Sequence, residues 1–330
     1  MQLTKCADGT WLAPGFIDLQ VNGFAGVDYN SPTAPAEEIS RSLRIMFSTG
    51  VTQCLPTVIT GSPENMLGAL RNLAGVDHAM IAGFHVEGPH ISPEDGPRGA
   101  HPWRWVRSPE VSEYRRWQDA TDGRIKLVTL SPEWPEAPRY IETLVRDGVA
   151  VSIGHTSATA AQITDAASAG ATLSTHLGNG AHASLPRHPN YIWEQLAEDR
   201  LSASFIVDGL HLSDTFLCVA LRAKGIARSV LVTDAVMPAM CAPGPYMLGE
   251  VEVELKDDQR VVLRGGTRLA GSSLRMDHAI SNVMRIAAVS LEDGVAMATA
   301  NPAHIVGIEP RGRVRFRMEN EQVQVIETQP

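Results

Sequence analysis

The sequence predicts an α/β fold, a (β/α)8 TIM-type barrel, and three observations support that prediction. Short apolar runs rich in β-branched residues alternate with amphipathic segments of helical period along the 330 residues. This alternation repeats eight times. Many of the apolar runs end in polar residues, as the strands of a barrel enzyme do. A doubly wound open sheet is the rival fold, but it usually has fewer strands and gives no reason for polar residues at so many strand ends.

The eight units follow one another in chain order. The expected strands are GFIDLQV (15–21), VTQCLPTVI (51–59), AMIAGFHVE (79–87), IKLVTL (125–130), VAVSIGH (149–155), ATLSTHL (171–177), SASFIVDGLHL (202–212) and SVLVTDAV (229–236). The expected helices lie within 35–50, 62–75, 108–123, 137–148, 159–170, 190–200, 213–225 and 275–290. Helices such as 62–75 and 213–225 begin behind Ser and end at Gly, which are the usual start and stop signals.

Two stretches fall outside this alternation. Residues 247–263 alternate apolar and charged residues around a KDDQ turn, which predicts a hairpin inserted at about 245–265, between the eighth strand and its helix. The tail RVRFRMENEQVQVIE predicts a second hairpin within 311–330, turning at Glu319 and Asn320. We expect the barrel to occupy residues 14–310.

Composition excludes several classes of function. The formal net charge of −9 argues against general nucleic-acid binding, which needs a basic surface. The sequence has neither an apolar run of membrane-spanning length nor an apolar signal-peptide core, so we expect a cytoplasmic protein without membrane association. The four cysteines are scattered without a CxxC pair, which predicts reduced thiols.

Polar residues gather at the expected strand ends. Because a barrel builds its active site at the C-terminal ends of its strands, we expect these side chains to share one mouth. In strand order, the set is Asp18, Gln20 and Asn22; His85 and Glu87; His155; His176; His211; and Asp234.

Glu87 raises the question of what a carboxylate does at the end of an apolar strand, because a buried charge is costly without a partner. His155 and His176, from strands five and six, can complete a three-ligand metal site of the kind found in catalytic zinc centres. Zinc, ferrous iron, manganese and cobalt remain open. Asp234 is then the expected general base and acid, and the reaction class is metal-assisted hydrolysis of a polarised carbonyl.

Other histidines and one loop have alternative interpretations. A lone histidine at a strand end is more often a hydrogen-bonded structural residue than a ligand, and His85 fits either core packing or support of the site from a layer below. The loop HASLPRHPN places His182, Arg187 and His188 close together, which suits either a phosphate contact or an ordinary solvated loop.

An ordered series of motifs resembles the N-acetylglucosamine-6-phosphate deacetylase family of the amidohydrolase superfamily, nearly end to end. The motifs are APGFIDLQVNG, HVEGP followed by GAHP, SIGHTSAT, THLGNG, DGLH, LVTDA, LAGSSLRM and ATANPA. The superfamily usually has HxH on strand one, whereas this family commonly has QxN, as Gln20 and Asn22 do here. That difference implies one metal ion rather than two.

The resemblance also implies roles for individual residues. Glu87, His155 and His176 match the metal ligands, Asp234 the acid/base and His101 the residue that approaches the substrate carbonyl. The matching substrate-binding positions are Asn179, the backbone of Gly180, Arg187, Asp208, His211, Leu269, Ala270 and Gly271. The family arginine often crosses a dimer interface, so the resemblance implies a homodimer.

Two departures from the family pattern set the alternatives. Only 13 residues precede Pro14, so residues 1–13 are expected to be the short remnant of a small β subdomain. Gly180 replaces the usual alanine, and RHPN stands where the family is closer to REPG.

The first hypothesis for the function is deacetylation of N-acetylglucosamine 6-phosphate. The second is deacylation of another N-acyl amino sugar, such as the galactosamine isomer or an unphosphorylated sugar. The third is a sugar-phosphate-binding barrel without turnover.

Overall fold

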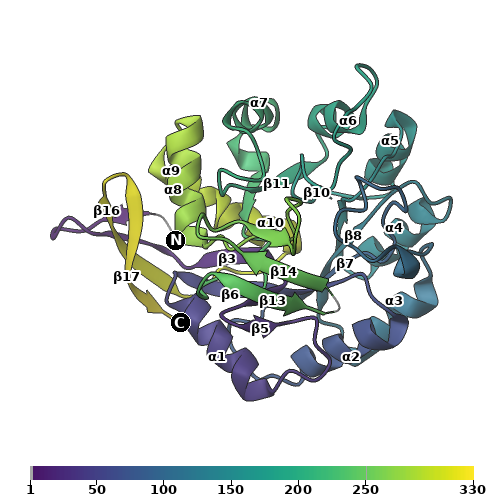
Figure 1. The fold of residues 1–330 in the computed structure, drawn as a ribbon. Coiled ribbons are helices and arrows are strands. Elements are labelled where there is room, and N and C mark those ends of the chain that lie inside the picture. Colours follow the sequence, from purple (N-terminus) through teal and green to yellow (C-terminus); the bar gives the residue numbers. More distant parts are fainter. Residues whose placement is uncertain (1–2, 250) are drawn as a thin grey trace.

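The barrel is built around an eight-stranded parallel sheet. The structure, a computed structural model, describes residues 3–249 and 251–330. The sheet has the order β12-β11-β10-β9-β8-β7-β6-β3, so each strand lies beside the next one along the chain (Figure 1). The strands are β3 (Phe16–Val21), β6 (Val51–Ile59), β7 (Phe84–Glu87), β8 (Ile125–Leu130), β9 (Ala150–Ile153), β10 (Leu173–Ser174), β11 (Ser202–Ile206) and β12 (Ser229–Val232). The predicted (β/α)8 barrel is confirmed.

The seam between the first and last strands is closed by backbone hydrogen bonds just beyond β12. The Asp234 amide donates to the Gln20 carbonyl at 2.9 Å, and the Asn22 amide donates to the Ala235 carbonyl at 2.7 Å. Val21 and Ala235 form an isolated parallel bridge. The barrel therefore closes at the rim where β3 and β12 end.

Helices surround the strands (Figure 1). The helix after each strand is, in order, α1 (Ala36–Phe47), α2 (Pro63–Ala74), α3 (Val111–Ala120), α4 (Ala137–Arg146), α5 (Ala160–Ser168), α6 (Tyr191–Ala197), α7 (Asp214–Lys224) and α8 (Met276–Ala287). Two further helices, α9 (Leu291–Met297) and α10 (Ala300–Val306), follow α8. The Ser62 hydroxyl caps α2 by accepting from the Asn65 amide, and Thr159 forms a capping box with Gln162 at α5.

A small antiparallel sheet joins the two ends of the chain, with the order β1-β2-β16-β17. Its strands are β1 (Thr4–Lys5), β2 (Trp11–Pro14), β16 (Arg313–Glu319) and β17 (Gln322–Gln329). Figure 1 shows this sheet at one side of the barrel. Phe316 of β16 is fully buried and packs against Phe16 of the first barrel strand, which fixes the sheet to the barrel.

The segment between β12 and α8 has one strand more than the hairpin predicted from the sequence. It forms a three-stranded sheet of β13 (Gly244–Leu248), β14 (Val251–Leu255) and β15 (Val261–Leu263), with the KDDQ turn between the last two strands. Its inner side chains pack with Val236 in a small apolar cluster of their own. Near the mouth, β4 (Gly23–Phe24) and β5 (Val27–Asp28) form a short ribbon.

Most buried apolar side chains belong to one core between the barrel strands and the helices. All six residues of β3 are buried, as expected for a strand covered on both faces. Within the described ranges, no helix combines the length and apolar character needed to cross a membrane.

Candidate active site

Glu87, His155 and His176 meet at the C-terminal end of the barrel. Glu87 is the last residue of β7, and each histidine lies two residues beyond the end of its strand, β9 or β10. Both histidines have positive φ, 49° for His155 and 30° for His176. All three side chains are buried. Sequence spacing predicted this convergence because a closed barrel brings these strand ends to one rim.

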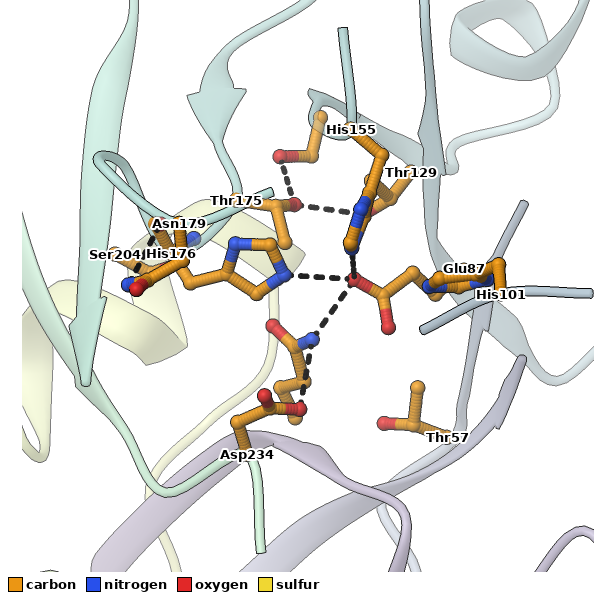
Figure 2. A network of polar contacts seen from close by, with 12 residues as sticks. Thr57, Glu87, His101, Thr129, His155, Thr175, His176, Asn179, Ser204 and Asp234 are labelled. Carbon is orange, nitrogen blue, oxygen red and sulfur yellow. Dashed lines mark hydrogen bonds and ion pairs between the residues drawn. The ribbon is translucent and has the colours of Figure 1, made fainter. Parts of the chain in front are cut away.

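One carboxylate oxygen lies between the two imidazoles. Glu87 Oε1 is 3.1 Å from His155 Nε2 and 3.0 Å from His176 Nε2, and Figure 2 shows both rings directed at it. Burial would raise the pKa of Glu87, but hydrogen bonds from both histidines hold it well below its usual range. Burial would likewise lower the pKa of His176, yet the hydrogen bond with Glu87 and its negative charge raise it.

This donor set fits a single divalent cation. The three ligand atoms lie within 4.8 Å of one another, and among the described residues no other group of three or more His, Cys, Asp or Glu side chains could hold a metal. His155 Nδ1 lies 2.8 Å from the Pro97 carbonyl. A proton on that nitrogen leaves Nε2 free to bind metal, and this type of support is usual for histidine ligands. One carboxylate and two imidazoles without thiolate suit zinc, iron, manganese or cobalt.

Asp234 is held by two side-chain amides, one from Gln20 in β3 and one from Asn22 just beyond β3. Its Oδ1 accepts from Asn22 Nδ2 at 2.7 Å and from Gln20 Nε2 at 3.2 Å. Gln20 Nε2 also lies 3.0 Å from Glu87 Oε1, so the same amide links the two carboxylates. Burial, followed by the charge of Glu87, raises the pKa of Asp234 to about 6. A carboxyl with this pKa can exchange a proton near neutral pH.

Asp18 lies below Asp234 at the barrel seam. Its carboxylate accepts hydrogen bonds from the Thr233 hydroxyl at 2.5 Å, the Thr233 amide at 3.2 Å and the Gln20 amide at 3.2 Å. Burial raises the pKa of Asp18 to about 7 in spite of these bonds. Asp18 therefore ties the first strand to the residue before Asp234.

His101 reaches the site from the loop after β7. Its ring centroid is 4.3 Å from that of His155, and Figure 2 places it on the Glu87 side of the cluster. His101 Nδ1 lies 2.8 Å from the hydroxyl of Thr60, which directly follows β6. Burial lowers the pKa of His101 to about 3, so its imidazole is neutral. Thr60 was not among the predicted site residues, although its position directly after a strand was a usable signal.

His85 lies deeper in the barrel than the Glu87 cluster. Its Nε2 is 2.8 Å from the Thr129 hydroxyl and its Nδ1 is 3.1 Å from the Leu19 carbonyl. Thr129 continues into a chain of hydroxyls through Thr175, at 2.7 Å, to Ser152, at 2.6 Å. These contacts anchor His85 within the barrel interior.

The predicted sugar-phosphate residues occupy two loops after β10 and β11. Asn179 Nδ2 donates to the His176 carbonyl at 3.3 Å. Gly180 has φ +56°, and a Cβ there would lie 2.6 Å from His155 Nδ1, so a side chain would meet the imidazole. Asp208 Oδ2 lies 2.6 Å from His211 Nδ1. Arg187 is exposed, and its side chain makes no hydrogen bond or ion pair within the residues that the structure describes.

The segment Leu269 to Gly271 runs from β15 back to the barrel seam. The Ser272 amide, next in sequence, donates to the Asp234 carbonyl at 3.0 Å. Gly271 has φ +75°, and a Cβ there would lie 2.4 Å from the Val236 side chain. The structure therefore brings this predicted substrate-lining segment beside Asp234.

Comparison with known proteins gives a consistent result. The chain matches the amidohydrolase family over residues 11–315. It is 32% identical to the N-acetylglucosamine-6-phosphate deacetylase of Lysinibacillus sphaericus over 311 residues, which are 93% of this chain and 79% of that protein. It is 35% identical to the Homo sapiens enzyme of the same name, over 91% of this chain and 76% of that protein.

A solved structure extends the likeness to three dimensions. The N-acetyl-D-glucosamine-6-phosphate deacetylase of Mycobacterium smegmatis superposes with a TM-score of 0.89 at 28% identity, covering 97% of this chain and 86% of that one. The resemblance inferred from the ordered motifs is confirmed. This chain belongs to the amidohydrolase family and, within it, to the N-acetylglucosamine-6-phosphate deacetylases.

Proposed function

We propose that this protein hydrolyses the N-acetyl group of N-acetylglucosamine 6-phosphate, giving glucosamine 6-phosphate and acetate. The observation that carries the proposal is that the side-chain amide of Gln20 contacts two carboxylates with different expected roles. Gln20 Nε2 contacts both Glu87, in the cluster suited to a metal ion, and Asp234, the carboxyl with a raised pKa. Relatives that cover most of the chain carry the name of this deacetylase.

Glu87, His155 and His176 would hold one divalent cation, with zinc as the first expectation. When bound, such an ion acts as a Lewis acid toward a carbonyl oxygen or a water molecule. Asp234 takes a proton from the attacking water and delivers it to the amine nitrogen as the carbon–nitrogen bond breaks. Gln20 and Asn22 hold its carboxylate in place through both steps.

His101 would polarise the acetyl carbonyl. The low pKa caused by burial keeps this imidazole neutral, so it carries one proton. If the Thr60 hydroxyl donates to Nδ1, that proton lies on Nε2 and can be donated to the carbonyl oxygen. His101 then stabilises the negative charge that develops on this oxygen during attack.

The sugar phosphate would be bound by Asn179, the backbone of Gly180 and His211, with residues 269–271 lining the sugar. Asp208, a further substrate-binding position, would hold His211 through their 2.6 Å contact. The protein would act in the cytoplasm as a homodimer. In that dimer, Arg187 of one subunit would complete the phosphate site of the other. Its exposed side chain without partners in the described chain is free for such a contact. A guanidinium also suits bidentate binding of phosphate.

The test is acetate release by protein reconstituted with zinc or ferrous iron. Substrates are N-acetylglucosamine 6-phosphate, its galactosamine isomer and unphosphorylated N-acetylglucosamine. We expect turnover of the first to exceed that of the other two. Metal-loaded protein that released no acetate from it would refute the proposed function, and preference for another sugar would refute the assigned substrate.

Subunit mixing tests the proposed dimer. Arg187→Ala and Asp234→Asn are each expected to be nearly inactive alone. When they are co-expressed, a mixed dimer has one site with an intact Asp234 and the partner's intact arginine. Activity regained on mixing supports an arginine that acts across the interface, and no regain contradicts it.

A further inference from the structure

Glu133 has no part in the proposed reaction, yet it lies at the centre of a polar network beside the metal cluster. It follows β8 by three residues and is partly buried. Its carboxylate accepts from the hydroxyls of Ser92 at 3.2 Å, Ser131 at 2.5 Å and Ser157 at 2.5 Å. It also accepts from the Ser157 amide at 3.0 Å and the Thr156 hydroxyl at 3.4 Å. All of these donors are neutral, and Glu133 has no ion pair within the described residues.

The donors come from three neighbouring strand ends. Ser92 belongs to the loop after β7, Ser131 follows β8, and Thr156 and Ser157 follow β9. The Ser131 hydroxyl is also 2.8 Å from the Thr156 hydroxyl. Glu133 thereby joins the loops that continue from the strands carrying Glu87 and His155.

The connection to His155 is direct through the backbone. Thr156 and Ser157 are the next two residues, and both donate to Glu133. The Ser92 amide donates to the His155 carbonyl at 2.8 Å, while the Ser92 hydroxyl donates to Glu133. His155 itself has a φ of 49°, in the left-handed region that is uncommon for non-glycine residues.

A simple helix-capping role does not account for the carboxylate. The following helix, α5, is already capped by Thr159, whose hydroxyl accepts from the Gln162 amide, while Gln162 Oε1 accepts from the Thr159 amide at 2.8 Å. Gln162 reaches Glu133 only at its backbone carbonyl, at 3.3 Å. The carboxylate is therefore directed at the turn that follows His155 and not at the start of the helix.

We propose that Glu133 is a positioning residue that fixes the backbone around His155. In that position, Nε2 of His155 points at the metal position while Nδ1 of His155 meets the Pro97 carbonyl. The inference rests on the proposed metal site. It assigns metal affinity and ligand geometry, and not sugar binding, as the properties that Glu133 controls. Partners that orient a metal ligand typically contribute 10- to 100-fold to metal affinity or activity.

The test compares Glu133→Ala, Glu133→Gln and Ser157→Ala with the parent protein. Metal affinity is measured by competition between protein and a chromophoric chelator for zinc alone, without sugar. We expect zinc binding to weaken about 10- to 100-fold in Glu133→Ala and less in the other two, which keep part of the network. The visible spectrum of cobalt(II) in each variant reports ligand geometry, and we expect it to change in the same order.

Two controls separate positioning from loss of stability. Glu136→Ala removes an equal charge from an exposed position in the same segment, and it should leave zinc affinity unchanged. Val283→Ala destabilises the core at α8 without touching the network, and its zinc affinity should also stay at the parent value.

At saturating metal, KM for the sugar should be unchanged in the Glu133 variants while kcat falls.

Parent-like zinc affinity and cobalt spectrum in Glu133→Ala would overturn the inference, even if its melting temperature drops. If Glu133→Ala does not fold, Glu133→Gln and Ser157→Ala decide by the same two readouts. Failure of the parent to deacetylate N-acetylglucosamine 6-phosphate would refute the proposed function alone, because the zinc and cobalt measurements need no substrate.

Discussion

The short hydrogen bond from Asn22 to Asp234 predicts a change in pH dependence when Asn22 is replaced by alanine. Asn22 Nδ2 lies 2.7 Å from Asp234 Oδ1, closer than Gln20 Nε2 at 3.2 Å. An amide donor stabilises the ionised carboxylate, and its removal therefore raises the pKa of Asp234. Since Asp234 accepts a proton only when it is ionised, the acid limb of kcat/KM should move to higher pH in Asn22→Ala.

The size of the shift follows from the strength of the bond. A hydrogen bond to a charged group contributes about 1.5–3 kcal/mol, and one pKa unit corresponds to about 1.4 kcal/mol. Complete loss of the Asn22 bond would therefore raise the pKa of Asp234 by at most about 1–2 units. Gln20 keeps its contact and water can enter the vacated space, which reduces the expected shift to about one unit. A bound divalent cation lowers the pKa of Asp234 in both proteins, so the prediction concerns their difference.

The measurement is kcat/KM for the phosphorylated sugar across the acid limb, at saturating metal. Asn72→Ala is the matched control, because Asn72 lies on α2, away from Asp234, and its side-chain amide donates a hydrogen bond to the Ala34 carbonyl. Its limb should coincide with that of the parent. An acid limb in Asn22→Ala that stays in place, or moves to lower pH, would contradict the assignment of Asp234 as the base.

Three further predictions concern catalysis, metal binding and the seam. Asp234→Asn should lower kcat by about 10²–10⁴ while metal analysis finds the parent's content, and metal loss would assign Asp234 to binding instead. Glu87→Gln should lose its metal on dialysis against a chelator that leaves the parent loaded, because it removes the anionic ligand of the cluster. Thr233→Val removes a 2.5 Å bond to Asp18, whose folded pKa of about 7 lies above its unfolded value, so stability falls as the pH rises from the unfolded pKa to about 7 and then levels off. Because this bond favours the ionised form of Asp18, its loss raises the folded pKa further and extends the fall in stability to higher pH. Urea unfolding should show a deficit of about 1–3 kcal/mol above pH 7 and a smaller one below it, and an equal deficit at both would argue against an ionised Asp18.

The positions of Glu87, His155, His176 and Asp234 were predictable because barrel geometry fixes them. Once the strands are counted correctly, every C-terminal strand end lies on the same rim, and a polar residue there faces the mouth regardless of its distance along the chain. The fold followed from the repeated alternation of apolar runs and amphipathic helices in the same way.

The third strand of the inserted sheet and the partners of Glu133 were not predictable from local pattern. β13 (Gly244–Leu248) contains Pro245, which cannot donate to a sheet and reads as a loop residue, although it is tolerated here because β13 is an edge strand. The donors to Glu133 come from three separate loops, and their meeting depends on loop conformations that no periodicity encodes.

The closure of the barrel between β3 and β12 sets an order for assembly of the active site. Glu87, His155 and His176 lie in the middle of the chain, and a growing polypeptide presents all three before Asp234 is synthesised. Asp234 takes its position only when the end of β12 meets Gln20 and Asn22 at the seam. A partly folded chain that has brought the proposed metal ligands together still lacks the proposed proton carrier, so closure of the barrel at this seam is required before the proposed site is complete.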